Sequence, residues 1–123
     1  MENRVTERVI TANLVLGVLG GHIGEKNGIT CEQLARKVTA TQDRPERDLR
    51  AERLVRKMIQ ELRTEGFHIC GTPETGYFLA SNGDELDRTC AFLYARAMTT
   101  LVQIARMKKV SVPDLRGQLK LPT

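Results

Sequence analysis

Two short clusters carry side chains able to do catalytic or metal chemistry. His68 and Cys70 stand two residues apart, so on a β-strand they would share one face and could both bind a metal. Zinc normally needs three or four ligands, and no Cys-x2-Cys or His-x3-His spacing supplies the others. The glycine-rich segment 20–24 lacks the Lys-Ser/Thr of a phosphate loop, and its His22 has no nearby Ser or Cys nucleophile. We therefore expect no enzyme active site, no metal and no cofactor.

The arginine-rich segment 44–63 has side chains suited to binding anions. At about 100° per residue, an α-helix over 45–65 has an apolar stripe on one side and basic and amide groups on the other. Arg and Lys bind phosphate oxygens, and Arg and Gln also reach base edges in a DNA groove. The residues of this basic face are Arg50, Arg53, Arg56, Lys57, Gln60 and Arg63, with Arg44 and Arg47 near the helix start.

Charge alone leaves a second interpretation of this helix open. Its basic side could be an ordinary solvated surface, with Glu46–Arg50 and Glu52–Arg56 as i,i+4 pairs. Residues 43–63 contain seven basic and five acidic side chains, and the whole chain of 123 residues has a net charge of +4. A mild excess of this kind is compatible with a polyanionic partner and equally ordinary for solubility.

Composition indicates one globular domain of a cytoplasmic protein. Apolar residues make up 41% and charged residues 28%, which argues against disorder. Three cysteines without a close pair fit a reducing compartment, and no apolar stretch approaches the ~18 residues of a membrane span.

Hydrophobic periodicity predicts a mainly α-helical fold with one β-hairpin, in the order helix, helix, helix, hairpin, long helix. The capping pairs Thr30–Gln33 and Asn82–Glu85 mark two of the helix starts. The expected elements are helices over 4–19, 31–38, 45–65 and 84–108, strands over 67–70 and 77–80 around a six-residue connection, and an irregular basic tail over 111–123. The apolar stripe of the 45–65 helix is Ala51, Leu54, Val55, Met58, Ile59 and Leu62.

The run IQELRTEGFHI at 59–69, followed by GYFL at 76–79, resembles the recognition-helix end and the wing of the biotin-repressor and DeoR-like winged-helix families. Those families have there an Ile, a Leu-Arg pair, a Gly, an Ile, then Gly-Tyr and a Leu. The run GITCEQLA at 28–35 is similar to the start of their second helix. The resemblance implies a winged-helix domain over 1–80 that binds double-stranded DNA. The small size and the tail also resemble proteins of phages and mobile elements, which implies a small transcriptional or phage-type regulator.

The sequence departs from these families in two places. Between Ala35 and Ile59 it has about ten additional residues, so either the recognition helix is extended or the preceding turn has become a longer loop. The wing tip also lacks a basic residue and carries Glu74, which phosphate would repel. The wing is therefore either structural or a DNA contact made through backbone amides and the hydroxyls of Thr72 and Thr75.

The long helix within 81–110 has an apolar face larger than a three-helix domain needs. Part of this face is expected to pack on the first helix and the rest to pair with a second chain, since such DNA-binding proteins commonly dimerise. The alternative is full burial within one chain. The face consists of Leu86, Cys90, Leu93, Ala97, Leu101 and Ile104. The acidic wing tip, the nearly balanced charge of 43–63 and this helix favour a rival function, a winged helix that docks proteins and binds no DNA.

Overall fold

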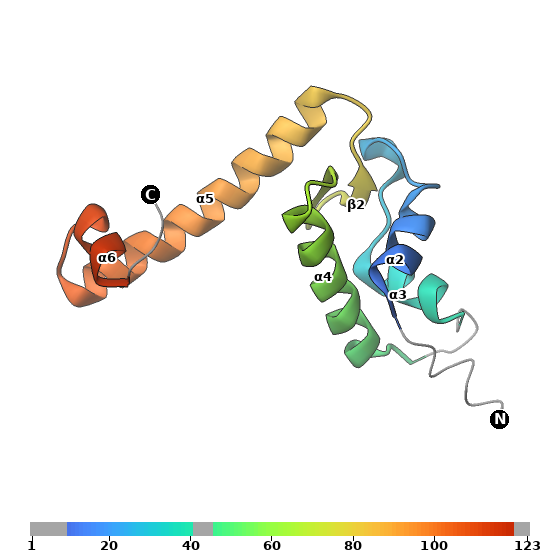
Figure 1. The fold of residues 1–123 in the computed structure, drawn as a ribbon, viewed down its shortest axis with the longest axis horizontal. Helices are drawn as coiled ribbons and strands as arrows, with labels where there is room; N and C mark the ends of the chain where they lie inside the picture. The colour runs from blue at the N-terminus through green and yellow to red at the C-terminus, as the bar shows by residue number, and fades with distance from the viewer. Residues whose placement is uncertain (1–9, 41–45, 120–123) are drawn as a thin grey trace. The chain divides into compact units, whose positions relative to one another are not determined.

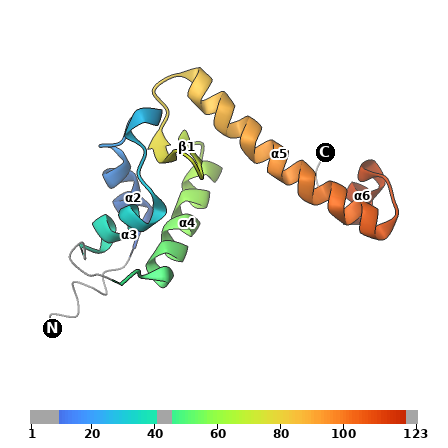
Figure 2. The same ribbon diagram turned by 180° about the vertical axis from the view of Figure 1, so that it is seen from behind.

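The computed structural model describes residues 10–40 and 46–119 and is mainly helical, with one small antiparallel sheet (Figures 1 and 2). The chain divides into two compact units, residues 1–89 and residues 90–123. In the part of the chain described, no helix is long and apolar enough to cross a membrane.

Three α-helices and a short 3-10 helix precede the small sheet in the described part of the first unit. They are α2 (Ala12–Leu19), η1 (Glu25–Asn27), α3 (Cys31–Thr39) and α4 (Leu49–Thr64). The apolar stripes of α2, α3 and α4 meet in a shared core, because each helix buries residues spaced three or four apart. The core side chains exposed by 2% or less include Val15, Leu19, Leu34, Val38, Val55, Ile59, Leu62 and Ile69.

Local signals placed α3 correctly and misplaced two helix starts. The capping box is confirmed, with Thr30 and Gln33 each bonding the other's backbone amide. The predicted helix from Arg4 is wrong at Thr11, which is extended and caps α2 through its hydroxyl. Residues 4–9 of that prediction lie outside the described part of the chain.

The helix α4 begins later than predicted. Asp48 is its N-cap, since its carboxylate accepts the amide of Ala51, and residues 46–48 precede the helix. Residues 46–48 thus belong to the connection that follows α3. Pro45, the predicted start, falls outside the described residues.

The hairpin pairs β1 (Ile69–Thr72) with β2 (Gly76–Leu79), in a register that places Cys70 opposite Phe78. The first predicted strand was two residues too early and the second one residue too late. The predicted six-residue connection was too long, because three residues, 73–75, join the strands. Phe67 bonds back to the carbonyl of Leu62 at the end of α4 and is 43% exposed, so it does not belong to the sheet.

The segment between α2 and α3 runs beside β2 and forms two isolated β-bridges with it. Ile29 forms an antiparallel bridge with Tyr77, and Ile23 a parallel bridge with Leu79. Gly28 makes this approach possible, since a Cβ there would overlap the carbonyl oxygen of Thr75. These bridges hold β2 against the segment that joins α2 to α3.

A long helix, α5 (Gly83–Lys108), follows the hairpin, and a short helix, α6 (Val112–Leu119), follows α5. The prediction of an irregular tail over 111–123 is wrong for α6. Ser111 caps this helix by accepting the amide of Asp114, and Leu115 is fully buried, as is nearly all of Ala105 on α5. Proline is tolerated in a first helical turn, so Pro113 does not prevent α6.

Candidate nucleic-acid interface

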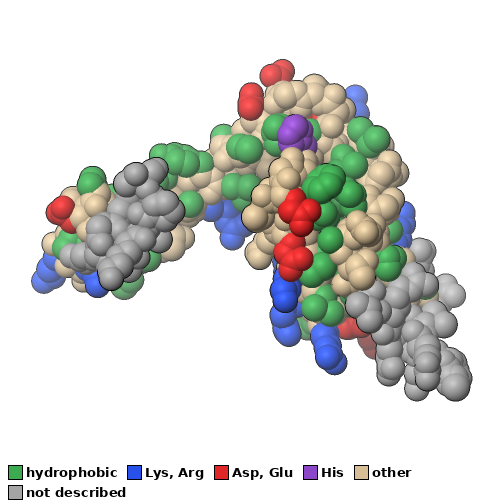
Figure 3. All heavy atoms as spheres, viewed as in Figure 1, with side chains coloured by type: hydrophobic (Ala, Val, Ile, Leu, Met, Phe, Trp, Pro, Cys, Tyr) green, Lys and Arg blue, Asp and Glu red, His purple; other side chains and the backbone are tan. Residues whose placement is uncertain are grey.

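The packing of α4 decides which of its side chains face solvent. Ala51, Val55, Ile59 and Leu62 are buried against the core, so the opposite side of the helix is free. On that side five predicted contact residues are exposed: Arg50, Arg53, Arg56, Lys57 and Gln60. Figure 3 shows Lys and Arg side chains gathered on one side of this helix. Leu54, predicted in the apolar stripe, is 38% exposed and lies beside this face.

Most of the exposed cations of α4 are not neutralised locally. Within residues 10–40 and 46–119, no carboxylate forms an ion pair with Arg50, Arg53 or Lys57. The expected Glu46–Arg50 and Glu52–Arg56 pairs are not formed. The two interpretations of this face, a DNA contact and an ordinary solvated surface, therefore differ in whether the unpaired cations bind a polyanion.

Arg56 and Arg63 are partly committed to the fold. Arg56 donates from Nη1 to the Sγ atom of Cys31 at 3.5 Å. Arg63 donates from Nε to the carbonyl of Ile69 at 2.8 Å, and its guanidinium lies 6.0 Å from the ring centre of Tyr77. Burial raises the pKa values of the Cys31 thiol and the Tyr77 phenol, so both groups stay neutral near pH 7. Arg63 thus ties the end of α4 to the hairpin.

The guanidinium of Arg47, whose side chain is 54% exposed, binds a buried carboxylate. The guanidinium binds both oxygens of Glu52, at 2.6 and 3.0 Å, although the Glu52 side chain is only 2% exposed. Glu32 on α3 lies 3.6 Å from Arg47 and 3.3 Å from Arg36. The result is a chain of alternating charges that joins α3 to the start of α4. The sequence analysis did not predict that Glu52 is buried. The position of Glu52 at the edge of the apolar stripe of this helix was the signal that could have indicated it.

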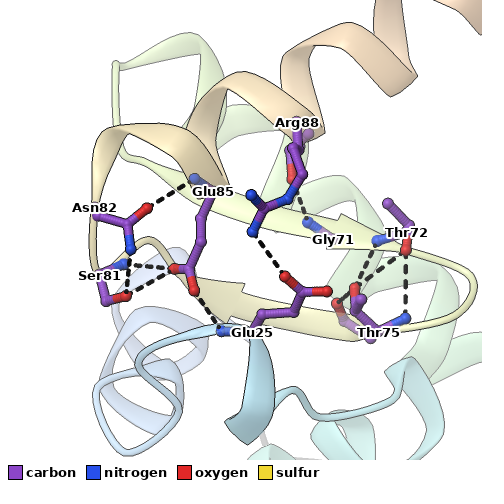
Figure 4. A network of polar contacts seen from close by, with 10 residues as sticks. Glu25, Gly71, Thr72, Thr75, Ser81, Asn82, Glu85 and Arg88 are labelled. Atoms are coloured by element: carbon purple, nitrogen blue, oxygen red, sulfur yellow. Dashed lines mark hydrogen bonds and ion pairs between the residues drawn. The ribbon is translucent and has the colours of Figure 1, made fainter.

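The remaining predicted contacts lie on the hairpin and in the connection. The hydroxyls of Thr72 and Thr75 are 3.2 Å apart, and each accepts the other residue's backbone amide (Figure 4). Thr75 also donates to the carbonyl of Gly76 at 2.9 Å. These hydroxyls thus hold the tip of the hairpin in shape. Arg44 lies outside the described residues.

A second polar network fixes the first turns of α5 to η1 (Figure 4). Glu85 accepts the amide and hydroxyl of Ser81 at 2.8 and 2.9 Å and the amide of Glu25 at 3.0 Å. Asn82 caps the helix as predicted, but the Glu85 side chain reaches Ser81 and Glu25 instead of returning to Asn82. The amides of Ser81 and Glu25 lower the pKa of the Glu85 carboxyl. Arg88 completes the network with an ion pair to Glu25 at 2.9 Å.

The residues considered for metal chemistry are not brought together. Cys70 is fully buried on β1, whereas His68 is exposed and precedes the strand. Among the described residues, no group of three or more metal-ligating side chains converges. The lining of a cavity of about 440 Å³ between α3 and the start of α4 includes the charged residues already paired around Arg47.

No known protein family, curated protein or solved structure matches the chain. The function therefore has to be argued from the geometry and charge of the described residues. On these grounds the exposed face of α4 is the strongest candidate for a binding surface.

Proposed function

We propose that this protein binds double-stranded DNA through the basic face of α4, as a winged-helix protein and a small transcriptional or phage-type regulator. The observation that carries the proposal is the row of exposed cations on α4 without local acidic partners: Arg50, Arg53 and Lys57. An α-helix fits the major groove of B-DNA, where Arg and Lys reach phosphates and guanine edges.

The distribution of acidic groups around α4 supports this proposal. The carboxylate of Asp48 is bonded to the Ala51 amide as the helix cap, and the buried carboxylate of Glu52 is paired with Arg47. Glu61 is the exposed acid that remains within α4. The exposed side of the helix is therefore more basic than the nearly balanced composition of the segment suggests, and it would attract a polyanion.

The architecture of the first unit also favours this proposal. A winged helix needs a helix pair that presents the second helix, followed by a β-hairpin. Here α3 and α4 share a core, the hairpin follows α4 directly, and Ile29 bridges to Tyr77 as a short third strand would. The hairpin tip adds no cation, so we assign the DNA contact mainly to α4.

A second candidate function is docking of a protein partner on the same helix. Leu49 is 58% exposed and Leu54 is 38% exposed, both on α4, and Phe67 just after it is 43% exposed. Exposed large apolar side chains beside charged groups are typical of protein interfaces. This function predicts that α4 binds a protein and that no duplex binding is measurable.

Fluorescence anisotropy with a labelled random-sequence duplex tests the DNA proposal. We expect binding at 50 mM salt that weakens at 200 mM, with a log–log slope of about −0.9 per phosphate contact. The double variant Arg53→Ala/Lys57→Ala should reduce the magnitude of that slope by up to about 1.8 and weaken binding at least tenfold at low salt. Its melting temperature should stay within about 2 °C of wild type, because neither side chain has a partner in the described fold.

Lys26→Ala is the matched control, because it removes an exposed positive charge from η1, away from α4. Its binding should change less than twofold. The DNA proposal is wrong if the wild-type protein does not bind duplex at tens of micromolar in 50 mM salt, or if the double variant binds as well as the control.

A further inference from the structure

The helix α5 exposes apolar side chains along most of its length. From Cys90 onward, the buried residues of the described second unit are Ala105 and Leu115. Leu93 is 37% exposed and Tyr94 is 65% exposed, and Cys90 and Ala97 are also exposed. Arg96 is the one charged residue between Thr89 and Ala105. An exposed apolar stripe of this kind is typical of a helix face that packs against another surface.

The spacing of the apolar face is symmetrical about Ala97. Leu93 and Leu101 stand four residues to either side, and Cys90 and Ile104 stand seven residues to either side. An antiparallel pair of identical helices related by a twofold axis brings residue i of one copy against residue j of the other, and j against i. A face with mirrored spacing satisfies this condition, with a small residue at the centre where the helices approach most closely.

The charges at the two ends of α5 discriminate between the possible orientations. Asp87 and Lys108 are exposed and stand ten and eleven residues on opposite sides of Ala97. In an antiparallel pair centred on Ala97, Lys108 of each copy comes beside Asp87 of the other. A parallel pair would instead set Lys108 against Lys108 and Asp87 against Asp87, which is unfavourable.

We propose that a second copy of this chain covers α5, with the two helices antiparallel and centred on Ala97. The contact would bring Leu93 against Leu101 and Cys90 against Ile104 over a seam about 21 Å long at 1.5 Å per residue. The paired surfaces bury the apolar side chains that each copy exposes alone. This inference is independent of DNA binding, since a dimer without DNA affinity would support it and a DNA-binding monomer would overturn it.

Disulfide cross-linking tests both the orientation and the register. In the antiparallel arrangement the two native Cys90 residues lie about 21 Å apart along the axis, beyond the ~7 Å that a disulfide spans. The variant Ile104→Cys should form a disulfide with Cys90 of the other copy under mild oxidation. Peptide mapping should identify the 90–104 linkage between chains. A Cys90–Cys90 linkage in the wild-type protein, or no 90–104 linkage in the variant, overturns the proposal.

Sedimentation equilibrium of the full chain provides a second test that does not depend on the cysteine variant. The wild-type protein should have twice the monomer mass of 13.8 kDa at tens of micromolar. Ala97→Asp places two carboxylates at the centre of the seam and should weaken association at least a hundredfold. Gln103→Asp is the matched control, because it adds the same charge at an exposed position off the apolar face, and it should remain dimeric. A monomeric wild-type protein, or equal behaviour of the two variants, overturns the proposal.

Discussion

Replacing Arg47 with alanine should destabilise the protein far more than replacing any exposed arginine of α4. The change leaves the Glu52 carboxylate, whose side chain is 2% exposed, without its two charge-assisted hydrogen bonds. Removing one partner of a buried ion pair costs about 3–5 kcal/mol. Arg47 itself is 54% exposed, so water can partly replace it, and we expect a loss of about 2–3 kcal/mol.

Urea denaturation measures this loss directly. With a slope of about 2 kcal/mol/M, the midpoint of Arg47→Ala should fall by about 1–1.5 M at an unchanged slope. Arg50→Ala is the control, because Arg50 is exposed and has no ion-pair partner among the described residues, and it should shift stability by less than about 0.5 kcal/mol. The double variant Arg47→Ala/Glu52→Leu should recover most of the loss, since an apolar side chain of similar size no longer needs the guanidinium.

Equal stability of Arg47→Ala and Arg50→Ala would refute a structural role for the Arg47–Glu52 pair. So would a double variant that is less stable than Arg47→Ala alone. Either result would mean that the Glu52 carboxylate is solvated without Arg47 and that the pair is an ordinary surface contact of little net value.

Two further predictions concern the hairpin contact and the network at the start of α5. Gly28→Ala should lower the free energy of unfolding by about 1–3 kcal/mol, because the added Cβ meets the backbone oxygen of Thr75. The control Gly17→Ala, in open space on α2, should raise it by up to about 1 kcal/mol. Equal effects in thermal or urea unfolding would contradict the close approach of Gly28 to Thr75. The amides that bond Glu85 lower its folded pKa below the unfolded value near 4.3, so its contribution to stability is present above that pH and lost as the pH falls through the folded pKa. Glu85→Gln should therefore flatten the fall in melting temperature below about pH 4.5. The control Glu74→Gln, at the exposed hairpin tip, should leave the dependence of melting temperature on pH unchanged. Identical pH dependence in the wild type and both variants would refute the contribution of Glu85.

Local sequence signals predicted the elements whose cause is itself local. The capping box at Thr30, the glycines after Leu19 and the apolar period of α4 fixed α2, α3 and α4 as helices and identified most of their buried sides. The start of α4 was wrong because Pro45 and Asp48 both resemble helix starts, and the hydrogen bond from Ala51 to Asp48 decides between them. The starts of these helices depend on contacts between residues only a few positions apart in the sequence.

The misplaced features depend on contacts between distant segments. Tyr77 of β2 bridges to Ile29, a distant contact that no local pattern reveals. The burial of Glu52 depends on Arg47, which turns back across the start of α4, and on Glu32 of α3. The helix α6 has a proline and a glycine in its sequence, and its stability comes from the burial of Leu115 in the second unit, not from its propensity.

The position of Arg47 also separates two ways in which it could contribute to DNA binding. Arg47, just before α4, is joined to α3 through Glu32 and to α4 through Glu52. If Arg47 contacts phosphate, its loss should lower the magnitude of the salt slope by about 0.9. If it positions α4, as its bonds to Glu52 suggest, Arg47→Ala should weaken duplex binding with an unchanged slope, and Arg47→Ala/Glu52→Leu should restore binding together with stability. A lower slope in both variants would assign Arg47 to the DNA contact and refute the positioning role.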